Sequence, residues 1–111
     1  MPRDYVTYLD DIENSILRIN SYIQDMNYES FVLDIKTQDA VIRNLEIIGE
    51  AVKSLPSDFI NKKEKNIPWN KIAGIRDILI HAYFNVDLQI IWDVIQNKLV
   101  DLKEACSRLK K

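Results

Sequence analysis

Apolar residues recur along this chain at alternating steps of three and four, over stretches much longer than a strand. The first such stripe consists of Tyr5, Leu9, Ile12, Ile16, Ile19, Ile23 and Met26. Because an α-helix turns once in about 3.6 residues, this spacing puts the apolar side chains on one helical face. We therefore predict an amphipathic helix over residues 4–26, with Asp4 as its N-cap.

Similar stripes predict further helices. Val41, Leu45, Ile48, Val52 and Leu55 indicate a helix over residues 37–55. Pro56 ends this helix, because proline lacks an amide donor and disfavours helical geometry before it. Pro68 opens a helix over residues 69–83, and Asp87 caps a last helix over residues 88–109. Short helical pieces are expected at residues 31–35 and 57–61.

Long amphipathic helices joined by short links predict an all-α fold, an up-and-down four-helix bundle with one or two extra short helices. Only two glycines and three prolines occur in 111 residues, fewer than a sheet-rich chain needs for its turns. We expect one domain over residues 1–111. The chain shows neither a signal-peptide pattern nor an apolar run that could span a bilayer, so we expect a cytoplasmic protein with no membrane contact.

The charge balance restricts the partners of the chain. Lys and Arg number 15 and Asp and Glu 17, so the formal net charge is −2. Proteins that coat nucleic acid are usually strongly basic, so RNA binding here requires local positive charge or a partner. Lys62, Lys63 and Lys65 lie in a polar stretch that we interpret as a solvated loop. The alternative is a phosphate-attracting patch near an active cleft.

One short helical segment collects Arg76, Asp77, the only histidine (His81) and Tyr83. Asp77 and His81 are four residues apart, so they share a helical face and can touch. Arg76 and His81 are about 140° apart round an ideal helix, so they flank a groove, and a second copy could supply the missing half of a site. Spacing alone also allows a structural interpretation, with surface charges, a capping or core histidine and a tyrosine at the rim.

These groups suit cleavage of an RNA phosphodiester. A histidine can take or give a proton near neutral pH. A guanidinium can hold the phosphate and stabilise the dianionic transition state. The RNA 2′-hydroxyl is an internal nucleophile, so this chemistry needs no metal.

Other chemistries have weaker support. Asp10, Asp11, Glu46 and Glu50 are scattered along the chain, which does not indicate a metal site. No glycine-rich phosphate loop occurs. Cys106 has no histidine near it in sequence, and we interpret it as a buried helical thiol.

At these residues the chain resembles the HepT-like branch of the HEPN superfamily. The signature of that branch is arginine, four residues, histidine, one residue, tyrosine, which Arg76, His81 and Tyr83 match. Residues 67–75 and 83–92 around the motif agree with the family, as do residues 38–51. The resemblance therefore covers most of the chain.

The resemblance implies a homodimer in which two motifs meet in a cleft at the interface. It implies a metal-independent ribonuclease toxin that needs no cofactor, with Arg76 and His81 as the catalytic pair and transfer RNA or messenger RNA as substrate. It also implies a partner, a nucleotidyltransferase antitoxin similar to MntA, which silences the toxin by transferring AMP to Tyr83. Assembly of the dimer with this antitoxin into higher hetero-oligomers stays open.

Asp77 departs from the family pattern, which often has asparagine there. Because a carboxylate is awkward beside a phosphate, we expect Asp77 to hydrogen-bond His81 and orient it. Gly49 lies inside a predicted helix, where glycine costs up to about 1 kcal/mol relative to alanine, so it indicates a close approach of another helix. We interpret Glu50 as a surface or interface residue.

A second function stays open: a non-catalytic helical module that binds a nucleotidyltransferase and presents substrate or nucleotide to it. The acidic net charge favours this module. The complete set of Arg76, His81 and Tyr83 favours the ribonuclease, because a pure scaffold has no need of it.

Overall fold

The computed structural model describes residues 4–81 and 87–111, with the backbone alone at residues 80 and 81. Its regular structure in these ranges is entirely helical, which confirms the predicted all-α class. The helices are α1 (Tyr5–Tyr22), α2 (Tyr28–Leu33), α3 (Ile35–Ser54), α4 (Ser57–Lys63), α5 (Trp69–His81), α6 (Leu88–Asn97) and α7 (Leu99–Leu109). No described helix is long and apolar enough to cross a membrane.

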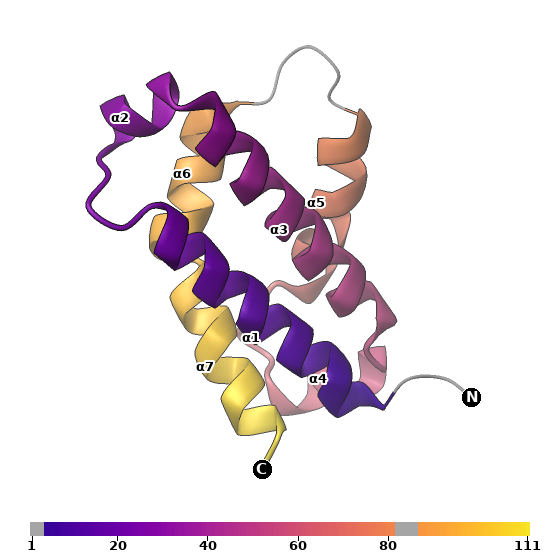
Figure 1. The fold of residues 1–111 in the computed structure, drawn as a ribbon. Helices are drawn as coiled ribbons and strands as arrows, with labels where there is room; N and C mark the ends of the chain where they lie inside the picture. Colours follow the sequence, from indigo (N-terminus) through magenta and orange to yellow (C-terminus); the bar gives the residue numbers. More distant parts are fainter. Residues whose placement is uncertain (1–3, 82–86) are drawn as a thin grey trace.

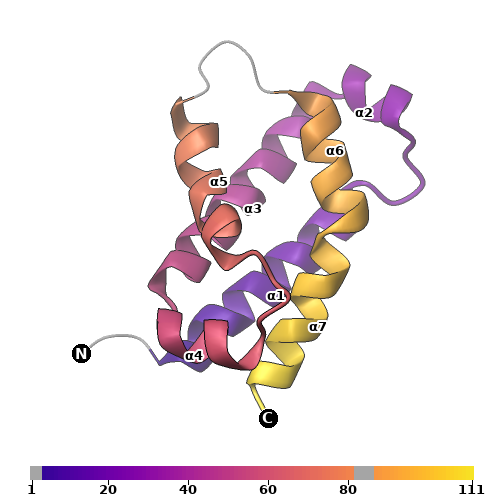
Figure 2. The same ribbon diagram turned by 180° about the vertical axis from the view of Figure 1, so that it is seen from behind.

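Four long helical segments surround the core. The helix α1 packs along both α3 and α7, while α3 also packs against α5. In Figure 1, α1 and α3 lie together and run in opposite directions, with α5 and the α6–α7 segment behind them. Figure 2 shows the molecule from the other side, with α5 and the α6–α7 segment in front. The main packing partner of α5 is α3. A cavity of about 490 Å³ lies between α3, α5 and the α6–α7 segment.

Two aspartate caps form as predicted. Asp4 Oδ1 accepts a hydrogen bond from the amide of Val6 at 3.2 Å at the start of α1. Asp87 Oδ1 accepts from the amides of Gln89 and Ile90 at the start of α6. The carboxylates satisfy amides that have no partner within the helix.

The first helix ends before the predicted boundary at residue 26. Its last helical residue is Tyr22, and Asp25 has a φ of 65°, a left-handed conformation that turns the chain. Ile23 is nevertheless buried, and Met26 packs against the core. The apolar stripe therefore extends past the helix, which is why the periodicity overestimated the length of α1.

The second and third helices begin earlier than residues 31 and 37. Asn27 Oδ1 accepts from the amide of Ser30, whose hydroxyl accepts from the amide of Asn27, so a capping box starts α2 at Tyr28. Asp34 Oδ1 accepts from the amide of Thr37 at 3.0 Å, and this hydrogen bond lowers the pKa of Asp34. This cap starts α3 two residues before the predicted position.

The polar stretch after Pro56 is more helical than predicted. Instead of a single turn at residues 57–61, α4 reaches Lys63 and includes Lys62 in its last turn. The ammonium of Lys63 lies 5.6 Å from the centroid of the Phe59 ring. Basic side chains at a helix C-terminus complement the helix dipole, so these lysines have a local role.

The predicted last helix, residues 88–109, is two helices that meet at Lys98. Lys98 lies in a turn with φ −110° and ψ −31°, in the right-handed region but with a φ well below the usual α-helical value of about −63°. The two halves have different partners: Trp92 of α6 packs against Phe31 of α2, with tilted rings whose centroids are 5.1 Å apart, whereas α7 packs on α1. Buried residues on both sides of the break keep the same spacing, so the stripe does not reveal it: Ile91, Ile95, Leu99, Leu102, Cys106 and Leu109.

Candidate active site on helix α5

The start of α5 is anchored to the rest of the molecule through Trp69 and Glu64. Trp69 is buried, and its indole Nε1 donates to the carbonyl of Glu64 at 3.0 Å. The Glu64 carboxylate accepts from both Nε and Nη2 of Arg108 on α7, with Nη2 at 2.7 Å. These hydrogen bonds lower the pKa of Glu64 below its usual range. Helix α5 thus starts from a position fixed by α7.

Gly49 brings α3 and α5 into close contact at Arg76, as its place inside a helix predicted. A Cβ on Gly49 would lie 3.0 Å from both the amide nitrogen and the Cβ of Arg76, and 3.2 Å from the carbonyl oxygen of Ile72. Since two of these atoms belong to the backbone, a side chain here would push the helices apart. The expected close helix approach is therefore confirmed.

The guanidinium of Arg76 is held by two carboxylates. Its Nε lies 3.0 Å from Glu50 Oε2 on α3, and its Nη1 donates to Asp77 Oδ1 at 3.1 Å. The Arg76 side chain is 38% exposed and that of Glu50 58% exposed. Ion pairs with this exposure contribute about 0–1 kcal/mol to stability. The contacts thus determine where the guanidinium lies more than they stabilise the fold.

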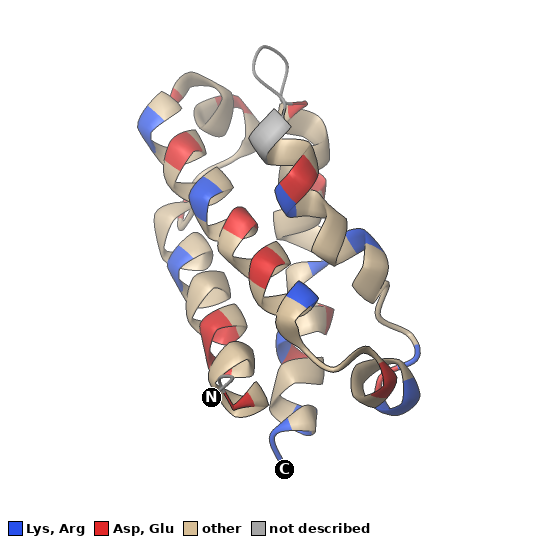
Figure 3. Cartoon of the chain, turned by 90° about the vertical axis from the view of Figure 1, so that its right-hand side faces the viewer, with Lys and Arg blue, Asp and Glu red and all other residues tan. Residues whose placement is uncertain are grey.

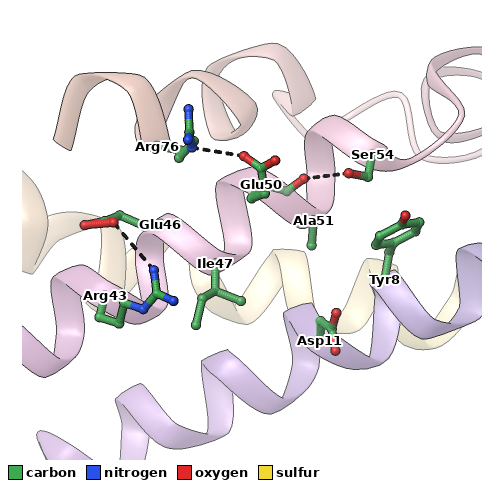
Figure 4. A pocket seen from close by; sticks show the side chains of 9 residues that line it. All are labelled: Tyr8, Asp11, Arg43, Glu46, Ile47, Glu50, Ala51, Ser54 and Arg76. Atoms are coloured by element: carbon green, nitrogen blue, oxygen red, sulfur yellow. Dashed lines mark hydrogen bonds and ion pairs between the residues drawn. The ribbon is translucent and has the colours of Figure 1, made fainter. Parts of the chain in front are cut away.

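Arg76 lies at the edge of a pocket of about 300 Å³ between α1, α3 and α5. Figure 4 shows its lining: Tyr8, Asp11, Arg43, Glu46, Ile47, Glu50, Ala51, Ser54 and Arg76. Arg43 pairs with Glu46 at 3.9 Å, separately from the pair between Arg76 and Glu50. With three carboxylates and two guanidiniums, the pocket has a formal charge of −1.

Among the described residues, the face that carries this pocket has no continuous basic strip. Figure 3 shows acidic and basic positions interspersed over it. Lys62 and Lys63 lie in the last turn of α4 instead of the predicted loop, and they are not among the residues that line the pocket. Positive charge near Arg76 is therefore local and balanced by carboxylates.

The structure brings together part of the predicted site. Arg76 and Asp77 are adjacent on α5, and the backbone of His81 belongs to the same helix. The carboxylate of Asp77 binds Arg76, whereas its expected contact with the His81 side chain lies outside the described residues, as does Tyr83. In the described part of the chain, no three His, Cys, Asp or Glu residues are grouped so that they could hold a metal ion.

Sequence reasoning missed Glu50 as a residue of this site. The sequence signal for Glu50 is its position directly after Gly49, because Gly49 indicates that another helix lies close by. Cys106 is buried, as interpreted, and desolvation raises its pKa to about 12. Such a thiol is protonated at neutral pH, so it is no nucleophile.

A family model described as Ribonuclease HepT-like matches residues 12–109. The chain belongs to the HepT-like ribonuclease family. This HepT-like chain is 43% identical over 111 residues to "Probable ribonuclease HepT" of Thermococcus cleftensis, with both chains covered completely. It is 49% identical over 106 residues to "Putative RNase MJ0127" of Methanocaldococcus jannaschii, covering 94% of this chain and 87% of that protein.

A third relative, "Putative RNase TTE0752" of Caldanaerobacter subterraneus, is 43% identical over 109 residues, which are 97% of the HepT-like chain and 93% of that protein. No solved structure matches the chain significantly. The family and the names of these relatives support an enzyme of the RNase type. The match also includes Arg76 and the helix that carries it.

Proposed function

We propose that this HepT-like chain is a metal-independent endoribonuclease, the toxin of a type VII toxin–antitoxin pair, and that it cleaves cellular RNA through the 2′-hydroxyl. The observation that carries the proposal is the half-exposed Arg76 guanidinium, fixed where α3 approaches α5 and on the same helix as His81. The proposed substrate is RNA, and the proposed nucleotidyltransferase partner uses ATP, so we place this activity in the cytoplasm.

In the proposed reaction, His81 removes the proton from the 2′-hydroxyl as its oxygen attacks phosphorus. The bond from phosphorus to the 5′-oxygen breaks, leaving a 2′,3′-cyclic phosphate, and the departing oxygen takes up a proton from water. Arg76 stabilises the extra negative charge on the phosphate oxygens in the transition state. Asp77, which already contacts Arg76, supports the position of the guanidinium.

Helical geometry favours a dimeric site. Arg76 and His81 are five residues apart, which is about 140° and about 7.5 Å along an ideal helix. Side chains diverging from one helix in this way do not meet at one phosphate, whereas those of two copies related by a two-fold axis can. We therefore propose that each protomer, a single-domain up-and-down bundle over residues 1–111, works as a homodimer.

The proposed partner is an MntA-like nucleotidyltransferase that transfers AMP to Tyr83. Tyr83 is two residues after His81 and seven after Arg76 in the sequence, so a modified tyrosine adds phosphate charge close to the proposed catalytic pair. This charge would occupy the donors that RNA needs, and the toxin would be silenced.

Cleavage of a defined RNA by purified protein tests the ribonuclease proposal. Arg76→Ala and His81→Ala should each lower kcat/KM by about 10²-fold or more, because each removes a group that acts in the transition state. The matched control is Arg43→Ala, which removes an arginine of the same pocket that pairs with Glu46 instead. Wild-type activity should persist in EDTA. Full activity of His81→Ala would refute its catalytic role.

Intact mass after co-expression with a nucleotidyltransferase of this type tests the regulation. The wild type should gain AMP units, and Tyr83→Phe should gain none while remaining toxic in the presence of the partner. An unmodified wild type that is still neutralised in a stable complex would show silencing by masking instead.

A second candidate is the non-catalytic module that binds a nucleotidyltransferase. The observation in its favour is the acidic balance of the pocket beside Arg76, together with the net charge of −2. RNA cleavage that is equal in the wild type, Arg76→Ala and His81→Ala would favour this module, because the cleavage would then come from a contaminant.

A further inference from the structure

One ion pair of the Arg76 pocket connects two helices that are far apart in the sequence. Glu50 Oε2 on α3 lies 3.0 Å from Arg76 Nε on α5, while the other pair in Figure 4, between Arg43 and Glu46, lies within α3. Gly49, immediately before Glu50, is the position where a Cβ would meet the backbone of Arg76. Two consecutive residues of α3 therefore act on the same arginine.

This contact adds little to the stability of the fold. Both side chains are partly in solvent, where water and salt screen the attraction between the charges. The packing of α5 on the core comes instead from apolar side chains, among them Ile72 and Ile75. The main effect of the Glu50 carboxylate is therefore to orient the guanidinium of Arg76.

The hydrogen-bonding groups of the guanidinium are divided between the protein and solvent. Nε forms the ion pair with Glu50 Oε2 and Nη1 donates to Asp77 Oδ1, and neither of these two contacts uses Nη2. Asp77 is carried by the same helix as Arg76 and moves with it, whereas Glu50 holds the guanidinium from a different helix. A free arginine head samples many rotamers, and fixing it in advance lowers the entropy lost when it meets a phosphate.

The geometry points to Glu50 as a positioning residue for the proposed ribonuclease: from α3 it holds Nε of Arg76, so that Nη2 faces the scissile phosphate. This inference rests on the ribonuclease function proposed above. A carboxylate so near the phosphate also repels the substrate. Glu50 therefore improves the transition state at some expense of RNA binding, and the two effects separate in kcat and KM.

Steady-state cleavage of one RNA by three variants tests this separation. Glu50→Ala should lower kcat about 10-fold or more without raising KM, because orientation is lost together with the repulsion. Glu50→Gln keeps a neutral oxygen of the same side-chain length within reach of Nε, where Glu50 Oε2 lies at 3.0 Å in the ion pair, so its kcat should stay within about 3-fold of wild type, with a lower KM. The control Glu46→Ala removes a carboxylate of the same pocket that pairs with Arg43, and its kcat should be unchanged.

The Nε–H signal of Arg76 in nuclear magnetic resonance spectra gives a readout that needs no activity. Glu50→Ala should shift this signal and speed its exchange with water, whereas Glu46→Ala should leave it in place. Unchanged kcat in Glu50→Ala, in an enzyme whose cleavage depends on Arg76, overturns the positioning role. An equal loss of kcat in Glu50→Gln and Glu50→Ala also overturns it, because the carboxylate would then act through its charge.

The two proposals fail in different ways. If cleavage by the wild type does not depend on Arg76, the ribonuclease proposal is refuted, and so is the role of Glu50 in positioning Arg76 for cleavage. A shifted Nε–H signal in Glu50→Ala would then still show that Glu50 orients the guanidinium, for a different ligand. If Glu50→Ala cleaves RNA as the wild type does and its Arg76 Nε–H signal is not shifted, only the positioning role is refuted.

Discussion

The α1–α7 contact and the α3–α5 contact hold the molecule together in different ways. In the first, α7 buries Leu102, Ala105 and Cys106 almost completely, and charged contacts reinforce it at the end. Lys110 Nζ lies 2.9 Å from both Asp10 and Glu13 of α1. In the second, α5 is fully buried only at Trp69, and its described side chains from Asn70 to Leu79 are half-buried or exposed.

This difference separates the scaffold from the candidate site. A helix that packs mainly on one neighbour loses few contacts when it carries polar groups, so Arg76 and Asp77 are tolerated there. The same two groups within the α1–α7 contact would be buried charges without sufficient partners. Arg76 and Asp77 of the candidate site therefore lie on a helix whose described side chains after Trp69 are half-buried or exposed.

Truncation of one isoleucine on each side should give the largest contrast. Ile12→Ala on α1 should lower the free energy of unfolding by about 2–5 kcal/mol, because the side chain is fully buried. Ile78→Ala on α5, where the side chain is 68% exposed, should change it by less than about 0.5 kcal/mol. Urea unfolding followed by circular dichroism measures both. A similar loss for Ile78→Ala would mean that another chain covers this face of α5.

Substitution of the two glycines sharpens the comparison. Gly49 and Gly74 both lie in helices, but only Gly49 has close neighbours where a Cβ would be added. Gly49→Ala should destabilise the fold by about 1–2 kcal/mol, since overpacking against Arg76 exceeds the gain in helix propensity. Gly74→Ala has nothing within 4 Å of the new Cβ and should stabilise the fold by about 0.5–1 kcal/mol. Thermal unfolding with opposite shifts of Tm is the expected result, and a stabilised Gly49→Ala would contradict the close contact.

The smallest effect concerns pH and the Glu64–Arg108 pair. Because the pKa of Glu64 is lowered in the folded protein, its contribution is fully present above the ordinary value of about 4.5 and is lost as pH falls through the folded value. Glu64→Gln should therefore lose less stability than the wild type between pH 7 and pH 3, as urea titrations can measure. Glu29→Gln, a change at an exposed carboxylate of α2, should follow the wild type.

The sequence predicts what depends on residues close together along the chain. The stripes revealed the long helices, and the caps at Asp4 and Asp87 followed from residue type, because side chain and amide are two or three residues apart. The break at Lys98 escaped because the apolar spacing continues through it. The end of α1 escaped for the same reason.

Contacts between distant residues could not be predicted in this way. Glu64 and Arg108 are 44 positions apart, and neither is part of a pattern that signals the pair. Gly49 indicated that a helix approaches, but not that the approaching residue is Arg76. The role of Glu50 depends on that second fact, so it emerged only from the packing of α5 on α3.

Chemical labelling of Cys106 can report the opening of the contact between α7 and α1. The thiol is buried in α7, and its pKa is raised to about 12. Reagents in solution therefore reach a reactive form of it only in molecules whose α7 has separated from α1. Since the chain has one cysteine, each labelled molecule has opened in this way, and the measurement requires no engineered probe.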